Sequence, residues 1–495
     1  MRKFSMLVSV GVFIVLAVMA SVVFAAYQHA GDADNDAKVF LGVYPGAAGT
    51  KLDNCALCHG GGEYTDPSTH KTTTMGSCQY CHAVTNYGQK TDQFAETLNS
   101  YGKDYLANGR NAAALKAIES LDSDGDGYTN IAEITAVRYP GDKNDDPTKV
   151  AAPSRVFDKA QLEAMPQHTQ FMLMNTTKSG DYYAEYSGVV MEHLLKRAGI
   201  RSDATRITVY APDGYSIAHP LADDPSNEGP SYAPYVNGTY PQAIYYYDPV
   251  ADLAKGGWCD YSSPGNAGRN NGDAIEVKGG LRYILALRAS GKDLVPGYLD
   301  STNKLASGTE GPFRTVTPQK FVGPPDQPSN KNNPSLIWPF DSTLDHNAGF
   351  SSKSATIIKV EPLPEGTTDI DVMEAGWNYV DTGKIVVYGD IDPQRNILDK
   401  LSALASVVRS ADDKAFKHPG FKRALAQEIN EARILVAKRH YKPAYRELQM
   451  EMLPKLEKCE QSGRHEGREW VTDCDLQQRL LWSLQEIITL LKIVV

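Results

Sequence analysis

The chain has 495 residues, 42% of them hydrophobic and 22% charged, a globular composition that excludes a wholly disordered or fibrous protein. This length suits roughly three domains. Acidic residues outnumber basic ones by 60 to 50 and no basic run is present, so we expect no nucleic-acid partner.

Residues 1–25 are predicted to be an export signal. Arg2 and Lys3 precede an apolar run over residues 6–24, and residues 23–25 fit a small-residue cleavage site. If the run is not cleaved, it is long enough to act as an N-terminal membrane anchor. Either way, we expect the remaining chain to lie outside the cytoplasm and to meet a membrane only through that anchor.

Two Cys-x-x-Cys-His motifs mark residues 26–150. They supply the cysteines Cys55, Cys58, Cys78 and Cys81 and the histidines His59 and His82. Cysteines at i and i+3 share one face of a helical turn, so both thiols can form thioethers to one porphyrin. The histidine that follows is then placed as the proximal iron ligand. The spacing therefore predicts two covalently bound haem c groups.

Two C-x2-C pairs also suit a structural zinc site, which is the main alternative. Zinc does not require a histidine after each pair, whereas haem attachment does, so haem is the favoured interpretation. Each iron also needs a sixth ligand or an open position. The candidates near the motifs are His70, then Met75 and His29, while the second domain offers His168 and His346.

Residues 92–106 and 111–121 are predicted to be helices, and the second runs into a twelve-residue loop of the EF-hand calcium type. The predicted calcium ligands, at positions 1, 3, 5, 7, 9 and 12 of the loop, are Asp122, Asp124, Asp126, Tyr128, Asn130 and Glu133. Gly127 supplies the sharp turn. The sequence therefore predicts one structural Ca²⁺ site.

Residues 151–389 are expected to form a β-rich, mixed α/β domain. Strand-like runs at 207–210, 281–287, 355–360 and 384–388 are separated by loops rich in Gly, Pro and Asn, with a helix predicted at 189–198. Cys259 lies in this region, and we interpret it as a buried small apolar residue.

Residues 390–495 show helical periodicity and predict a bundle. Pro454 should kink or end the third helix. Cys459 and Cys474 flank a polar stretch between two helical patterns, and in an oxidising compartment they are expected to form a disulfide. No catalytic residue set is visible there, so the bundle is predicted to serve docking or assembly.

Segments 186–200 and 207–216 resemble the molybdopterin-binding domain of the sulfite oxidase superfamily, as does the Gly-Pro-x-Arg stretch at 311–314. The whole arrangement resembles exported dihaem proteins of metal-reducing bacteria that are named for a Gly-Glu-Gly-Pro motif. Here that motif reads Gly308-Thr309-Glu310-Gly311-Pro312, with a threonine inserted. The resemblance implies the periplasm or cell exterior of a Gram-negative bacterium, with other redox proteins, especially cytochromes, as partners.

The resemblance to molybdenum enzymes breaks down at the metal. Their molybdenum is held by a cysteine thiolate, but the corresponding residues 173–180 contain no cysteine. We therefore expect a degenerate domain without molybdopterin and an electron carrier in preference to a catalyst, with no catalytic residue assigned. The alternatives are a molybdopterin-dependent oxidoreductase that passes electrons to its own haems, and an assembly or docking component of a multihaem complex.

Overall fold

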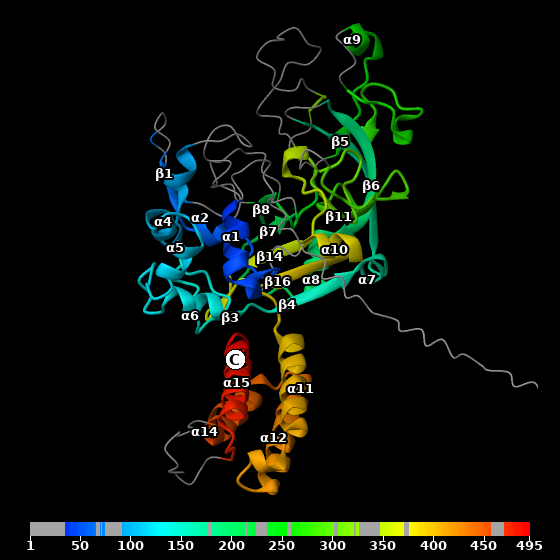
Figure 1. Cartoon of the computed structure of the whole chain (residues 1–495). Coiled ribbons are helices and arrows are strands. Elements are labelled where there is room, and N and C mark those ends of the chain that lie inside the picture. The colour runs from blue at the N-terminus through cyan, green and yellow to red at the C-terminus, as the bar shows by residue number, and fades with distance from the viewer. Residues whose placement is uncertain are drawn as a thin grey trace, which may run out of the picture.

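The computed structural model describes residues 35–65, 70, 72–74, 92–176, 180–212, 215–223, 235–240, 242–254, 259–300, 305–320, 323–325, 347–370, 376–456 and 470–495. The protein is a multidomain molecule of mixed α/β class, as the sequence predicts (Figure 1). None of its described helices is both long and apolar enough to span a bilayer. The predicted export signal lies outside the described residues.

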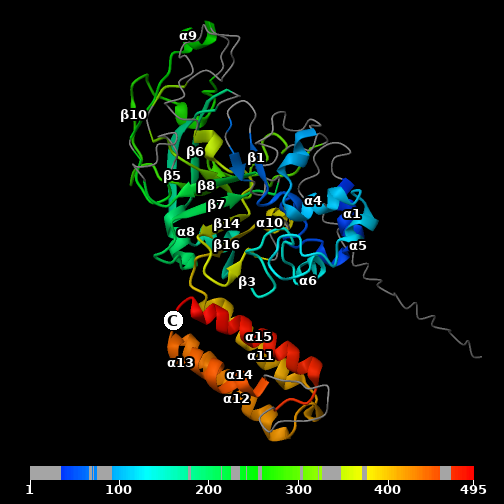
Figure 2. The same cartoon turned by 90° about the vertical axis from the view of Figure 1, so that its left-hand side faces the viewer.

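The N-terminal module consists of short helices and one hairpin, which lie beside the sheets in Figures 1 and 2. Its elements are α1 (Asn35–Val43), η2 (Pro45–Ala47), α2 (Ala56–His59), β1 (Glu63–Thr65), β2 (Thr72–Thr74), η3 (Asp92–Thr97), α4 (Ser100–Ala107), α5 (Ala112–Ala117) and α6 (Asn130–Thr135). The helix predicted at 92–106 is divided into η3 and α4. The division falls at Asn99, which has extended backbone and caps α4 by accepting a hydrogen bond from the Gly102 amide.

Two five-stranded sheets form the body of the protein. The first has the order β12-β11-β6-β5 with β13 also paired to β11, and the second has the order β4-β16-β14-β7-β8. Only β14 and β16 run parallel among the described pairs of these sheets. Their strands are β4 (Ser154–Asp158), β5 (Gln167–Met174), β6 (Tyr182–Val190), β7 (Arg206–Tyr210), β8 (Ser216–Pro220), β11 (Ile284–Ala289), β12 (Lys292–Asp293), β13 (Arg314–Val316), β14 (Ile357–Glu361) and β16 (Lys384–Gly389).

Smaller elements complete this body: α7 (Lys159–Glu163), α8 (Met191–Ala198), β9 (Ala243–Ile244), α9 (Pro249–Ala254), η4 (Pro264–Asn266), β10 (Ala274–Ile275), η5 (Asn347–Phe350) and α10 (Gly376–Thr382). A shared core lies between the two sheets. Leu285 of the first sheet and Ile358 of the second both belong to it, together with Leu194 of α8. Alternate residues of a strand face opposite ways, so the neighbouring Ile357 packs into a separate core on the other face of the second sheet.

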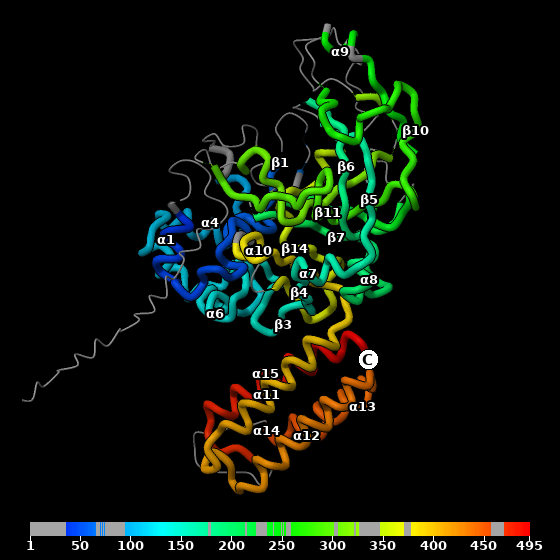
Figure 3. Tube along the Cα trace, turned by 90° about the vertical axis from the view of Figure 1, so that its right-hand side faces the viewer, coloured from blue at the N-terminus to red at the C-terminus, as the bar shows by residue number. Residues whose placement is uncertain are grey.

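The C-terminal bundle begins directly after β16 and extends away from the sheets (Figures 2 and 3). Its helices are α11 (Gln394–Ser410), η6 (Asp413–Ala415), α12 (Pro419–Ala437), α13 (Tyr441–Arg446), η7 (Glu447–Met452), α14 (Leu453–Leu456) and α15 (Cys474–Lys492). Helix α11 packs against both α12 and α15. At Pro454 the helix does not end. Instead, the preceding residues of η7 widen into a π-helix, which accommodates a ring that would clash with a carbonyl of the previous turn.

All three parts meet at one short parallel strand pair. Strand β3 (Val150–Ala151), at the exit of the N-terminal module, pairs with β15 (Thr367–Thr368) of the sheet domain. The Val150 side chain is buried in the apolar core of the bundle. The same strand pair therefore contacts the module, the sheets and the bundle.

Candidate haem and calcium sites

The first Cys-x-x-Cys-His motif forms one helical turn. Cys55 precedes α2, which ends with His59, and the His59 amide donates to the Cys55 carbonyl over 3.1 Å. Between the cysteines, Leu57 is buried in the core of the module and Cys58 packs against that core. The turn thus has the geometry that the motif predicts, with an apolar surface alongside it.

Asn99 clamps this turn from outside the motif. Its side-chain amide donates to the carbonyl oxygens of Leu57, at 3.0 Å, and Gly60, at 3.1 Å, while its backbone amide donates to Cys58 over 2.8 Å. The approach is so close that a Cβ atom on Gly102 would lie 2.5 Å from the Cys58 carbonyl oxygen. Asparagine before a helix is a recognisable cap signal, but its second role at α2 is a tertiary contact that sequence reasoning missed.

His59 is held by Thr97. Its Nδ1 lies 2.8 Å from the Thr97 hydroxyl, so Nε2 is the nitrogen that an iron would use. Burial lowers the pKa of His59 to about 4, which keeps the imidazole neutral as a metal ligand must be. Burial also raises the pKa of Cys58 to about 12. The cysteine pair and the neutral, oriented histidine fit a thioether-linked haem.

The other predicted haem residues are only partly described. Cys78, Cys81, His82, Met75, His29 and His346 lie outside the described residues. His70 is exposed in the turn between β1 and β2, in the left-handed region with φ +56°. His168 lies near the start of β5, and Figure 1 shows β5 on the opposite side of the sheets from the N-terminal module. His70 is thus the described candidate that follows the first motif most closely.

The predicted calcium loop brings its carboxylates together. Asp122, Asp124 and Asp126 each offer an oxygen within 4.8 Å of the others. Glu133 is 0% exposed, and neither of its carboxylate oxygens receives a hydrogen bond from the described chain. Burial, with the charges of Asp124 and Asp126, raises the pKa of Glu133 to about 9. A buried carboxylate facing two others is costly unless a cation joins them, so these residues fit Ca²⁺.

The remaining loop positions differ in their surroundings. The Asn130 side chain is buried, where it accepts from the Ser123 amide at 3.2 Å and donates to the Ile118 carbonyl at 2.8 Å. These bonds tie the end of the loop to the helix that precedes it. Tyr128 donates its backbone amide to Asp126 over 2.8 Å, and its carbonyl remains the predicted seventh-position ligand.

Helix α6 ends in a turn with unusual backbone. The amide of Arg138 donates to the carbonyl of Glu133 at 2.8 Å, and that of Val137 to Ile134 at 3.2 Å, which together make a Schellman motif. The left-handed position of this motif usually holds glycine, but here it holds Val137 with φ +58°. This conformation costs an L-residue roughly 1–2 kcal/mol, so contacts on both sides must impose it.

In the sheet domain, Cys259, Asn347 and Arg314 are buried among other protein groups. Cys259 is buried in the core of the first sheet, where Tyr261 packs against the same cluster. The Asn347 side chain donates to the carbonyls of Leu173 and Thr317, so it links the end of β5 to the segment that follows β13. Arg314 is 1% exposed, donates hydrogen bonds to the hydroxyls of Tyr186 and Tyr182, and forms an ion pair with Glu310.

Cys474, at the start of α15, is disulfide-bonded. Its predicted partner Cys459 lies outside the described residues, so that pairing stays a prediction. No family model, curated protein or solved structure matches this chain.

Proposed function

We propose that this protein is an exported dihaem c-type cytochrome that transfers electrons outside the cytoplasm and holds one Ca²⁺. The observation that carries the proposal is the Cys55–His59 turn, where two cysteines and a neutral, oriented histidine stand beside an apolar core. Haem iron supplies one-electron chemistry when it is bound. Cys55 and Cys58 would hold the porphyrin, His59 would ligate iron, and Thr97 fixes the imidazole.

The second haem is proposed from the repeated motif at Cys78–His82, with His70 as the first candidate for a distal ligand. Export to the periplasm or cell exterior is proposed because haem is attached outside the cytoplasmic membrane. The partners would be other redox proteins, principally cytochromes. No catalytic side-chain set is needed for this activity, since a carrier only has to position and bury its iron.

A reduced-minus-oxidised visible spectrum with a haem count per chain tests the proposal. Purified after export, the protein should show c-type absorbance and two haems per chain. Replacing Cys55 and Cys58 together by serine should halve the count, whereas Cys259→Ser should leave it unchanged. A colourless sample, or one that releases zinc when its thiols are modified, would refute the haem proposal.

The calcium site is proposed from the orphaned oxygens of Glu133 and from the cluster of Asp122, Asp124 and Asp126, whose charges act on Glu133. Terbium luminescence sensitised by tyrosine, competed by Ca²⁺, measures binding directly. Glu133→Gln should weaken binding strongly because it removes the ligand that offers two oxygens. Equal affinities of Glu133→Gln and the unaltered protein would exclude Glu133 as a ligand.

We also propose that the sheet domain is a degenerate relative of molybdopterin-binding domains. The engagement of Asn347 and Arg314 with protein groups supports this, as does burial, which raises the pKa of the Cys259 thiol and opposes metal binding by its thiolate. Metal analysis should find no molybdenum. About one molybdenum per chain, with activity lost in Cys259→Ser, would favour the alternative of a molybdenum oxidoreductase.

A further inference from the structure

The turn at Val137 connects the calcium loop to a buried ion network. On one side, Glu133 contributes a carboxylate to the loop and its backbone carbonyl accepts from Arg138. On the other side, the Arg138 guanidinium donates to the carbonyls of Val137 and Lys149, each at 2.7 Å, and pairs with Asp145 at 3.7 Å. A strained residue thus stands between two anchored groups.

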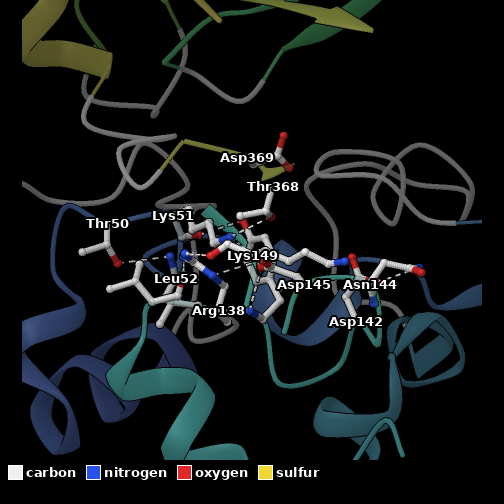
Figure 4. Close-up of polar contacts among 12 residues, drawn as sticks. Thr50, Lys51, Leu52, Arg138, Asp142, Asn144, Asp145, Lys149, Thr368 and Asp369 are labelled. Atoms are coloured by element: carbon white, nitrogen blue, oxygen red, sulfur yellow. Dashed lines mark hydrogen bonds and ion pairs between the residues drawn. The ribbon is translucent and has the colours of Figure 1, made fainter. Parts of the chain in front are cut away.

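Asp145 joins this turn to the first haem motif. One of its oxygens accepts from the Tyr139 amide at 2.9 Å and from Lys51 Nζ at 2.5 Å. Lys51 is 0% exposed and lies four residues before Cys55. The Tyr139 hydroxyl donates to the Lys51 carbonyl at 2.9 Å. The segment after the calcium loop and the segment before the haem turn are therefore held as one unit (Figure 4).

Lys51 also reaches across to the sheet domain. Its ammonium donates to the Thr368 hydroxyl on β15 at 3.1 Å. The neighbouring Asp369 pairs with Lys359 at 2.7 Å and accepts from the Tyr388 hydroxyl at 2.8 Å. Figure 4 shows Lys51, Asp145 and Arg138 facing Thr368 across this junction. A buried ammonium shared by two domains is stabilised only while both stay in contact.

We propose that calcium binding and docking of the N-terminal module onto β15 are coupled through the turn at Val137, Arg138 and Asp145. The inference rests on the proposed calcium site. Calcium holds Glu133 against the aspartates, so that α6 ends where its strained turn delivers Arg138 and Tyr139 to Asp145. Without calcium, no cation holds Glu133 against the aspartates, so α6 is released and the contacts that keep Lys51 against Thr368 weaken. Calcium thereby regulates how tightly the N-terminal module binds to β15.

Binding linkage is reciprocal, so a change at the docking junction must alter calcium affinity. The test uses the full-length, haem-loaded protein, stripped with a chelator and titrated with Ca²⁺ by calorimetry. Thr368→Val removes only the hydroxyl that Lys51 reaches, and it lies in a different domain from the calcium loop. We expect Thr368→Val and Lys51→Met to bind Ca²⁺ at least about fivefold more weakly than the unaltered chain.

Lys38→Met is the matched control because Lys38 is an exposed lysine of the same module. It removes the same charge and should leave the affinity unchanged. In parallel, stripping calcium should speed hydrogen exchange in residues 366–370. If Lys51→Met fails to load haem, the calcium affinity of Thr368→Val alone tests the coupling.

The outcomes separate the two proposals. Calcium binding with equal affinity in Thr368→Val and the unaltered chain, and unchanged exchange at 366–370, overturns the coupling but leaves the calcium site standing. An equal loss in Lys38→Met attributes the effect to net charge and also overturns the coupling. Failure of the unaltered chain to bind Ca²⁺ refutes both. The visible spectrum of each variant reports the haem proposal independently.

Discussion

Asn99 should stabilise the haem-binding turn by more than its role as a helix cap explains. Asn99→Ala removes the α4 cap and leaves the Leu57 and Gly60 carbonyls without their donor. We expect a loss of about 3 kcal/mol, about 1 from the cap and about 2 from the two carbonyls. Asn99→Asp keeps the capping oxygen but loses the donors, so it should cost about 2 kcal/mol.

The matched control is Asn111, which caps α5 through the amides of Ala113 and Ala114 but is exposed. Asn111→Ala should therefore cost only about 1 kcal/mol. Native-state hydrogen exchange of segments 54–62 and 99–107 measures these losses locally, without relying on unfolding of the whole multidomain chain. If Asn99→Ala destabilises no more than Asn111→Ala, or if only segment 99–107 responds, the clamp on the haem turn is refuted.

Three further predictions concern the other sites. Thr97→Val should raise the reduction potential of the first haem by about 40 mV in a spectroelectrochemical titration, because losing a hydrogen bond of about 1 kcal/mol to His59 weakens the electron donation that stabilises oxidised iron. Thr97→Ser keeps the hydroxyl and should leave the potential unchanged. An unchanged potential in Thr97→Val would contradict this role of Thr97. The calcium-free protein should lose stability in denaturant titrations as pH rises from about 4.5 to about 9, since the raised pKa of Glu133 lets the folded state bind a proton more tightly than the unfolded state. Calcium affinity should increase over the same range by up to about tenfold per pH unit, and a flat profile would count against a buried Glu133 ligand. Cys474→Ser removes the disulfide and should destabilise the bundle by about 3 kcal/mol, which is the value for closing a loop of about 15 residues. If adding reductant leaves the melting curve of the unaltered protein unchanged, the disulfide does not contribute to stability.

Local patterns predicted much of the fold. The run 384–388 is strand β16, and the helix predicted at 189–198 is α8 from Met191. These succeeded because apolar residues recur with the period of each element. The twelve-residue loop pattern also predicted that Asp122, Asp124 and Asp126 come together, because all three lie in one short segment, while calcium binding there stays a prediction.

Features that depend on distant residues could not be predicted. Strand β5 was missed because its apolar residues form a run at one end instead of alternating, and only pairing with β6 defines it. Pro454 was predicted to kink or end its helix. It lies in α14, directly after the π-helical turn η7, and no local signal indicated that turn. The partners of Lys51 and the second role of Asn99 are tertiary contacts between residues far apart along the chain, which carry no local signature.

The bond between Lys51 and Thr368 links positions 317 residues apart, and this has a consequence for biogenesis. A chain secreted from its N-terminus delivers both cysteine motifs before β15, which pairs with β3 at the exit of the N-terminal module, and before the bundle that buries Val150. Haem attachment would thus precede the docking of the N-terminal module against β15. The later arrival of β15 would bury Lys51, so a truncated product lacking the C-terminal half should carry cofactor yet remain sensitive to proteases near Lys51.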